Sequence, residues 1–219
     1  KEFVIWSNEK KGLSKLIYKV LSLGTTDISP KALAFDDKIG RIITIIGIPS
    51  AFLLHGYVGF IFGSVKANPW WSSVLMPIVF LFSAMVSGIA LMILVYIVTT
   101  MFRWKQLSMA CLNKLAEILL YAMIVDFSLE LLDFIQRLYE SEESITILAS
   151  MVSNRLFISL IITQVILGTI FPIIAIAVAR FGRFPDELRR YLFFIAAILV
   201  QVGIFSTRWN VVIGGQLFS

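Results

Sequence analysis

The sequence predicts an all-α fold, a polytopic transmembrane helix bundle with about five spans. Its 219 residues are 58% hydrophobic and only 15% charged, and their mean hydropathy is +0.89. A soluble domain carries about 25% charged residues, so lipid rather than water solvates most of this chain. Five stretches also qualify as membrane spans, for which a bilayer core requires about 20 apolar residues.

A polar segment precedes the predicted spans. Residues 1–38 are basic, and their KGLSKLIYKVLSLG stretch resembles a short amphipathic helix at the membrane surface. The transmembrane bundle occupies residues 39–206, and residues 207–219 form a C-terminal segment beyond it. Within the bundle, the predicted spans are 39–64, 74–102, 112–138, 156–181 and 191–205.

Loop charges predict which side of the membrane each end occupies, because loops rich in Lys and Arg stay in the cytoplasm. Three basic stretches share one side: the segment 1–38, the connection after residue 102, and the RFGRFPDELRR connection. The opposite side carries an acidic connection with Glu140, Glu142 and Glu143. We therefore expect a cytoplasmic N-terminus and an extracytoplasmic C-terminal segment.

One stretch, Gly47–Gly88, gathers candidate ligand-binding groups on the predicted outer face. It holds His55, Tyr57 and Lys66 near the end of the first span, and Trp71 in the following loop. His55 and Lys66 share one helix face, whereas Tyr57 lies about 200° away from His55 around a regular helix. We interpret the stretch as the wall of a small-molecule site, with Tyr57 at the ligand and His55 nearer a proton route.

The same features also have structural interpretations. Gly59 and Gly63 have the small-xxx-small spacing of closely packed membrane helices. Trp70 and Trp71 are the residue type that forms aromatic belts at membrane interfaces. His55 is also suited to an interhelical hydrogen bond. The sequence leaves both kinds of interpretation open.

The third predicted span, 112–138, differs from the others because it carries several acidic residues. Asp126, Glu130 and Asp133 lie at i, i+4 and i+7, so they form a narrow stripe on one helix face. A charged carboxylate at the middle of a bilayer costs about 2.5–3.5 kcal/mol on insertion scales, so the stripe must face protein or water. It predicts a proton path toward the outer site. The structural alternative is that Asp133 pairs with Arg137, and that Asp126 hydrogen-bonds a neighbouring helix.

The remaining reactive residue types restrict the chemistry of this chain. One cysteine (Cys111) and one histidine (His55) exclude an iron–sulfur cluster or a bis-histidine haem held by this chain alone. Phosphate-binding and metalloprotease motifs are absent, no metal site is expected, and no nucleic-acid partner is expected. Thr163, Gln164 and Thr169 in the fourth span are interpreted as helix-packing groups.

Two segments resemble the NrfD/polysulfide reductase family of membrane subunits, to which PsrC belongs. The stretch from Tyr57 through KANPWW to LMP is similar to the family pattern Tyr-Thr-Gly…Pro-x-Trp…Leu-Pro. The ending Arg208-Trp-Asn210…Gly-Gly-Gln216 is similar to the Arg-x-Asn…Gly-Gly-Gln that closes many members. The resemblance covers about residues 39–219. The HGYVG and KANPWW variants are most similar to the DsrP branch, which belongs to the sulfite-reduction-associated DsrMKJOP complex.

The resemblance implies a haem-free, quinone-reactive membrane subunit of a respiratory redox complex, catalytic only together with partner subunits. In such a complex, menaquinone exchanges electrons with an extracytoplasmic iron–sulfur subunit of ferredoxin type, during sulfur metabolism in anaerobic respiration. The implied location is the cytoplasmic (inner) membrane of a prokaryote. The family tyrosine that contacts quinone falls on Tyr57. The expected quinone contacts are Tyr57, His55, Trp71 and Lys66, and the expected outer-face motif is Arg208, Asn210 and Gln216.

Two departures from the family pattern accompany this resemblance. Members usually have eight to ten spans, so the chain corresponds to the C-terminal part of a two-bundle fold, with N-terminal spans missing or supplied elsewhere. The family's other quinone contacts, an Asn and a His on an early helix, have no counterpart here. Two other function classes stay open: an ion or proton transporter or channel component without a redox role, and a purely structural anchor.

Overall fold

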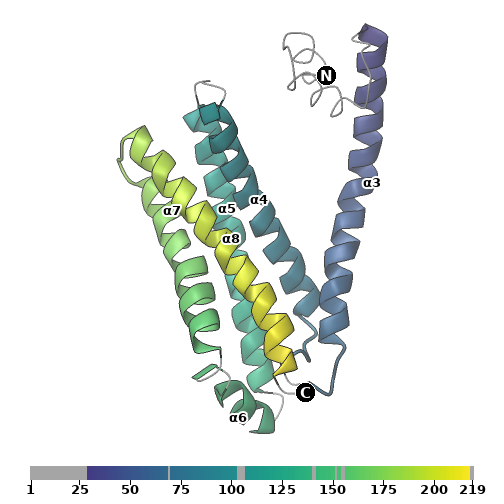
Figure 1. Cartoon of the computed structure of the whole chain (residues 1–219), viewed down its shortest axis with the longest axis vertical. Helices are drawn as coiled ribbons and strands as arrows, with labels where there is room; N and C mark the ends of the chain where they lie inside the picture. Colours follow the sequence, from purple (N-terminus) through teal and green to yellow (C-terminus); the bar gives the residue numbers. More distant parts are fainter. Residues whose placement is uncertain are drawn as a thin grey trace, which may run out of the picture. The chain divides into compact units, whose positions relative to one another are not determined.

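The computed structural model describes residues 29–68, 70–102, 107–139, 142–150, 152–153 and 156–217. Within these ranges every regular element is a helix (Figure 1), so the predicted all-α class is confirmed. The amphipathic helix predicted before residue 29, and the loop charges Arg103, Lys105, Glu140 and Arg155, lie outside the described residues. The helices are α3 (Pro30–Gly63), α4 (Met76–Phe102), α5 (Met109–Leu138), α6 (Glu142–Ser150), η2 (Phe157–Ile170), α7 (Phe171–Phe181) and α8 (Asp186–Gln216).

The chain is a membrane-embedded, multi-pass helical protein. Four helical stretches are long and apolar enough to cross a membrane: Pro30–Gly63, Met76–Met101, Phe157–Phe181 and Asp186–Gln216. The 30-residue helix α5 is as long as these but carries charged side chains. It buries Asp126, Asp133 and Arg137, so its charged stripe faces protein.

Two compact units divide the chain, residues 1–52 and residues 53–219. In the first unit, the described residues form the start of α3, where Thr44 and Ser50 donate their hydroxyls to carbonyl oxygens four residues earlier. The second unit contains the end of α3 and the bundle of α4, α5, η2, α7 and α8. Pairs of these bundle helices pack directly on one another: α4 on α5, and α8 on α4, α7 and η2.

An apolar core fills the bundle on the side where α5 and α8 begin. Helices α4, α5, α7 and α8 each bury large side chains there, among them Ile93, Leu119, Ile176 and Phe193. At the other end of the bundle, the loop after α3, the end of α5 and the end of α8 come together (Figure 1). The polar cluster described below lies at that end.

Helix α8 extends beyond the span predicted over 191–205 and continues to Gln216. The prediction followed the apolar run, which stops before Arg208 and Asn210. In the folded protein Asn210 is buried and Arg208 is largely covered, so their polar groups meet protein and the helix continues. Which of these residues lie beyond the membrane stays a prediction.

Helix η2 is a π-helix, a wider coil with i→i+5 bonding that is rare beyond a single turn. The hydroxyls of Thr163 and Thr169 follow this register and donate to carbonyl oxygens five residues earlier. The wide coil ends where α7 begins, next to Pro172, which has no N–H to donate. Both bonds lie within η2, so the helix-packing role of these threonines stays a prediction.

Helices η2 and α8 approach most closely at Gly168 and Gly203. A Cβ atom on either glycine would collide with the backbone of the other. We expect Gly203→Ala to lower the free energy of unfolding by about 1–3 kcal/mol, because the two backbones must move apart. Equilibrium unfolding in mixed detergent micelles measures this change.

The matched control for this prediction is Gly88→Ala in α4. Among the described residues, no atom lies within 4 Å of a Cβ built at Gly88. There the substitution should leave stability unchanged or raise it by up to about 1 kcal/mol through helix propensity. Equal effects at Gly88 and Gly203 would contradict the close contact.

Candidate functional site

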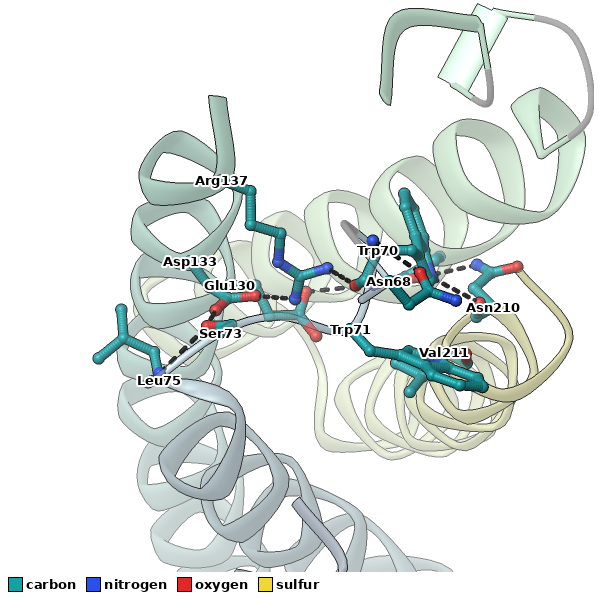
Figure 2. Close-up of polar contacts among 11 residues, drawn as sticks. Asn68, Trp70, Trp71, Ser73, Leu75, Glu130, Asp133, Arg137, Asn210 and Val211 are labelled. Atoms are coloured by element: carbon teal, nitrogen blue, oxygen red, sulfur yellow. Dashed lines mark hydrogen bonds and ion pairs between the residues drawn. The ribbon is translucent and has the colours of Figure 1, made fainter. Parts of the chain in front are cut away.

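Three side chains of the loop after α3, two indoles and one amide, donate hydrogen bonds to backbone carbonyls at the end of α8. Trp70 Nε1 donates to the carbonyl of Asn210 at 2.9 Å, and Trp71 Nε1 donates to that of Val211 at 2.6 Å (Figure 2). Asn68 Nδ2 donates to the carbonyl of Gly215 at 2.7 Å. Carbonyls in the last turn of a helix lack intrahelical partners, so Asn68 also caps α8.

Gly214 and Gly215 make room for these two indoles. A Cβ on Gly215 would overlap the Trp71 ring, and one on Gly214 would lie 2.9 Å from Trp70 Nε1. Trp70 is only 4% exposed, so it is not part of an aromatic belt facing lipid. The tryptophans of the loop and the glycines of the C-terminal motif thus form one packed unit.

The spacing Gly59xxxGly63 packs the end of α3 against the start of α4. A Cβ on Gly59 would lie 2.6 Å from Pro77 Cα, and one on Gly63 would collide with the Ser73 carbonyl. The close-packing interpretation of these glycines is confirmed.

A buried ion pair lies beneath the loop. Arg137 donates to the carboxylate of Asp133 and also to the carbonyl of Trp70, and the Ser73 hydroxyl donates to the other Asp133 oxygen (Figure 2). Asp133 and Arg137 are 4% and 7% exposed. The i+4 pairing that the sequence offered as a structural alternative is confirmed, and Asp133 holds loop and helix together.

A second hydrogen-bonded chain crosses from α5 to α8 by way of η2. Gln164 Nε2 donates to Glu130 Oε2 at 3.3 Å. Gln164 Oε1 in turn accepts a hydrogen bond from Asn210 Nδ2 at 2.8 Å. Three helices therefore contribute one polar side chain each.

Arg208 brings a second positive charge to the same region from α8. Its Nη2 donates to Ser83 Oγ at 2.6 Å and to the Phe80 carbonyl at 3.0 Å. The guanidinium lies 3.9 Å from the centre of the Phe80 ring, which is a cation–π geometry. The guanidinium is also within electrostatic range of Asp126 and Glu130. Both acids therefore have a cation nearby.

Several polar atoms of this cluster have no hydrogen-bond partner in the described part of the chain. Buried polar groups are nearly always hydrogen-bonded. A buried donor or acceptor without a hydrogen bond lowers the folding stability by about 1–3 kcal/mol. The cluster therefore has spare capacity to bind water or a ligand. These atoms are Asp126 Oδ1, Glu130 Oε1, Arg137 Nε, Arg208 Nη1 and Asn210 Oδ1.

A cavity of about 90 Å³ lies inside the cluster. Glu130, Asp133, Arg137, Gln164 and Asn210 line it together with apolar side chains of α4 and α8. A water molecule needs about 10–15 Å³ and two to four polar partners, and both are available here. The cavity is suited to a few ordered waters rather than to a large ligand.

A larger pocket of about 290 Å³ lies at the junction of α3 and α4. Lys66 and Ser64 line it with Phe60, Val74 and Pro77. Ser73 lines it as well. Because the Ser73 hydroxyl bonds Asp133, this pocket adjoins the buried ion pair.

The structure separates the four predicted quinone contacts. Tyr57 is 63% exposed and shares a helix face with Phe60, which lines the pocket at Lys66. His55 is half-buried and lies on the face of the buried Gly59. The indole N–H of Trp71 donates to the carbonyl of Val211. Of the four predicted contacts, Lys66 therefore lines the pocket, whereas Tyr57, His55 and Trp71 do not.

The three residues of the predicted outer-face motif do not lie together. Arg208 and Asn210 turn into the polar cluster, whereas Gln216 is exposed at the end of α8. Sequence reasoning missed Ser73, and it interpreted Gln164 as a helix-packing group without placing it in the site. A glutamine within an apolar span was a usable signal for Gln164, but the sequence around Ser73 carries none.

Comparison with known proteins agrees with the sequence motifs. Residues 5–219 match the family model described as "Polysulphide reductase, NrfD". The chain is also 34% identical over 219 residues to a selenate reductase subunit of Mesobacillus selenatarsenatis, covering 97% of this chain and 49% of that protein. It thus spans about half the length of this curated relative. Because the family model covers nearly the whole chain, the chain belongs to the polysulphide reductase NrfD family.

Proposed function

We propose that this chain is the quinone-interacting membrane subunit of a reductase complex. It would exchange electrons between menaquinone and an extracytoplasmic iron–sulfur subunit of ferredoxin type, and work only together with its partner subunits. The family match and the relative's role as a reductase subunit support this assembly. The observation that carries the proposal is a charged cluster in which Asp126, Asp133 and Arg137 are buried and Glu130 and Arg208 are half-buried. Several of its polar atoms have no hydrogen-bond partner among the described residues.

The chemistry of quinones explains why such a cluster is useful. Quinone reduction consumes protons as well as electrons, so a quinone-reactive subunit needs groups that carry protons within the membrane. Ionisable residues at that depth are costly and are usually functional. Asp126, Glu130 and Asp133 are the groups that would carry protons here.

A route from the larger pocket supports this assignment. In the proposal, the quinone ring lies in the pocket lined by Lys66 and Ser73, with the Tyr57 hydroxyl as a hydrogen-bonding partner. Ser73 bonds Asp133, and the 90 Å³ cavity then extends from Asp133 to Glu130. Protons would pass along these groups and the waters of the cavity.

Electrons must come from another subunit in this proposal. One cysteine and one histidine in the sequence cannot ligate a cluster or a bis-histidine haem by themselves. We place the loop after α3 and the end of α8 on the outer side of a prokaryotic inner membrane, where an extracytoplasmic partner would dock. The motif variants favour the sulfite-reduction-linked DsrP branch, and assays of the purified complex with sulfur and selenium oxyanions test that choice.

The quinone content of the purified complex, with a titration by a quinone-analogue inhibitor, tests the proposed function most directly. We expect bound menaquinone, co-purification of an iron–sulfur subunit, and inhibitor-sensitive electron transfer. Ion movement in liposomes without quinone or an iron–sulfur partner would instead support the transporter alternative.

Variants at the first span test the predicted quinone contacts. Tyr57→Phe removes only a hydroxyl, and we expect quinone turnover to fall by about 10-fold, the size expected for one lost hydrogen bond of about 1.4 kcal/mol. His55→Ala should impair turnover as well, while the complex still assembles. Steady-state quinone kinetics measure both effects.

Tyr121→Phe in α5 is a matched control, because Tyr121 is 56% exposed and lines neither the 90 Å³ cavity nor the pocket at Lys66. Its turnover should stay at the level of the unmodified complex. Unchanged turnover in both Tyr57→Phe and His55→Ala would remove this assignment of the quinone contacts.

A further inference from the structure

We propose that α5 and η2 form a second ligand site, open to the bilayer, that binds the hydroxylated ring of a quinol with Glu130 as its polar anchor. This inference rests on the proposed function and adds a site to it. A pocket of about 280 Å³ lies between the two helices. Its walls include Phe127, Leu131, Phe134 and Ile161, and its polar members are Glu130 and Gln164.

The composition of the pocket is that of a small-molecule site. Such sites measure about 300–1,000 Å³ and combine mostly apolar, often aromatic walls with a few polar groups that orient the ligand. Here Phe127 and Phe134 supply aromatic faces on which a ring can stack. The volume suits one ring system whose apolar tail stays in the lipid.

The two carboxyl oxygens of Glu130 differ in their surroundings. Oε2 accepts a hydrogen bond from Gln164, which is only 7% exposed and is held from its other side by Asn210. Oε1 is buried and has no hydrogen-bond partner among the described residues. Glu130 is therefore held in place by one oxygen, and its other oxygen keeps an unused capacity to accept a hydrogen bond.

The charge of the pocket selects among lipid-soluble ligands. Its lining contains an acid and no Lys or Arg among the described residues, so it disfavours the phosphate of a phospholipid. A quinol hydroxyl donates a hydrogen bond that a carboxylate accepts, whereas an oxidised quinone offers only acceptors. Leu131 at the rim is 49% exposed, so a ligand can enter sideways from the bilayer.

Glu130 also connects this pocket to the interior of the bundle. Glu130, Phe134, Leu160 and Gln164 line both the bilayer-facing pocket and the 90 Å³ cavity of the polar cluster. The Glu130 carboxyl group would therefore lie between a bound quinol and the other acids of the proposed proton route. A ligand bound here would lie one side chain away from that cluster.

Photocrosslinking tests this second site. A short-chain naphthoquinol with a diazirine on its tail is added, under anaerobic reducing conditions, to the protein purified with its membrane partners in lipid nanodiscs. Mass spectrometry then locates the crosslinked peptides. We expect crosslinks on residues 127–134 and 160–165 that an excess of unlabelled quinol displaces.

Adjacent isoleucines provide a matched pair of variants. Ile161 lines the pocket, whereas Ile162 does not and is 37% exposed. Ile161→Trp should fill the pocket and reduce these crosslinks by about tenfold, which corresponds to about 1.4 kcal/mol of binding free energy. Ile162→Trp should leave them within about twofold.

Glu130→Gln is a nearly isosteric second variant. It should weaken binding of the quinol by several-fold more than binding of the oxidised quinone, because hydrogen bonds to charged groups are stronger than those between neutral groups. A pocket in which Glu130 has only a packing role would show equal effects on both forms.

The outcomes separate this inference from the function on which it rests. Displaceable crosslinks confined to residues 57–77 would overturn the second site and leave the proposed function standing. Crosslinks on α5 and η2 that persist equally in Ile161→Trp and Ile162→Trp would also overturn it. If no quinol-displaceable crosslink forms anywhere, both proposals fail.

Discussion

Arg137→Ala is expected to lower the free energy of unfolding by about 3–5 kcal/mol, the usual cost of removing one partner of a buried ion pair. Arg137 is 7% exposed, and it donates both to Asp133 and to the carbonyl of Trp70. Its loss leaves a buried carboxylate with Ser73 as its one remaining partner among the described residues. It also releases the loop that fastens α8. Equilibrium unfolding in mixed micelles measures the change.

Two controls distinguish the effect of breaking the buried ion pair from the effect of removing a surface charge. Lys114 pairs with Glu117 at 3.3 Å, but its side chain is 68% exposed, so Lys114→Ala should cost at most about 1 kcal/mol. The double variant Asp133→Leu/Arg137→Met removes both charges together. It should recover much of the loss, because replacing a buried pair by apolar groups is often near neutral. Equal losses in Arg137→Ala and Lys114→Ala would contradict the burial of the pair.

Asp126→Asn is expected to reduce proton-coupled quinone turnover by about 10²-fold, the lower range for loss of a general acid–base group. Asp126 is 5% exposed, with Oδ1 unpartnered among the described residues. Asparagine matches its shape but does not take up and release a proton. The fold should survive, which thermal unfolding checks, so the loss would be chemical rather than structural.

Glu117→Gln is the matched control on the same helix. Glu117 lies toward the beginning of α5 and pairs with Arg180 at 3.1 Å, on the far side of the apolar core from the cluster. Turnover of this variant should stay within about twofold of the unmodified complex. Unimpaired turnover in Asp126→Asn would take Asp126 out of the proton route and leave it a structural role.

Three of the five predicted helices follow from local sequence to within three residues, whereas α3 begins at Pro30, nine residues before the predicted start at residue 39. The predicted stretches 112–138 and 156–181 correspond to α5 at Met109–Leu138 and to the continuous helix Phe157–Phe181. The reason is physical: in lipid every backbone polar group must be satisfied internally, so a long apolar run has to be a helix. The prediction was poorest for α8, whose polar final turns are buried by neighbours that the local sequence does not reveal.

The acidic stripe was also predictable, whereas its partners were only partly so. Helical periodicity alone places Asp126, Glu130 and Asp133 on one face and offers Arg137 as the local partner of Asp133. Ser73 lies 60 residues from Asp133 along the chain, and Gln164 lies 46 residues from Asn210. Contacts at such separations depend on how whole helices pack, and no local pattern specifies them.

The stretch from Tyr57 to Trp71 and the C-terminal motif were likewise predictable as residues of interest, whereas their contacts were not. Tyr57, Trp71, Arg208 and Asn210 all stood out as polar or aromatic residues in an apolar chain. The structure gives them different partners. The Trp71 indole bonds the Val211 carbonyl of α8, Arg208 bonds Ser83 of α4, and Asn210 bonds Gln164 of η2. Tyr57 is 63% exposed and is not a member of this cluster.

By itself, the sequence determined that this protein is a helical membrane bundle with a one-sided acidic helix, and its motifs indicated the family. Both properties depend on composition and on spacing within single helices, where neighbours along the chain are neighbours in space. Only the tertiary structure decided that Ser73, Gln164 and Arg208, from three other elements, join Arg137 around those acids. It also decided that Glu130 lines both an inner cavity and a second pocket between α5 and η2. Side chains meet across helices only where close packing brings the helices together, as the contact of Gly168 with Gly203 does for η2 and α8.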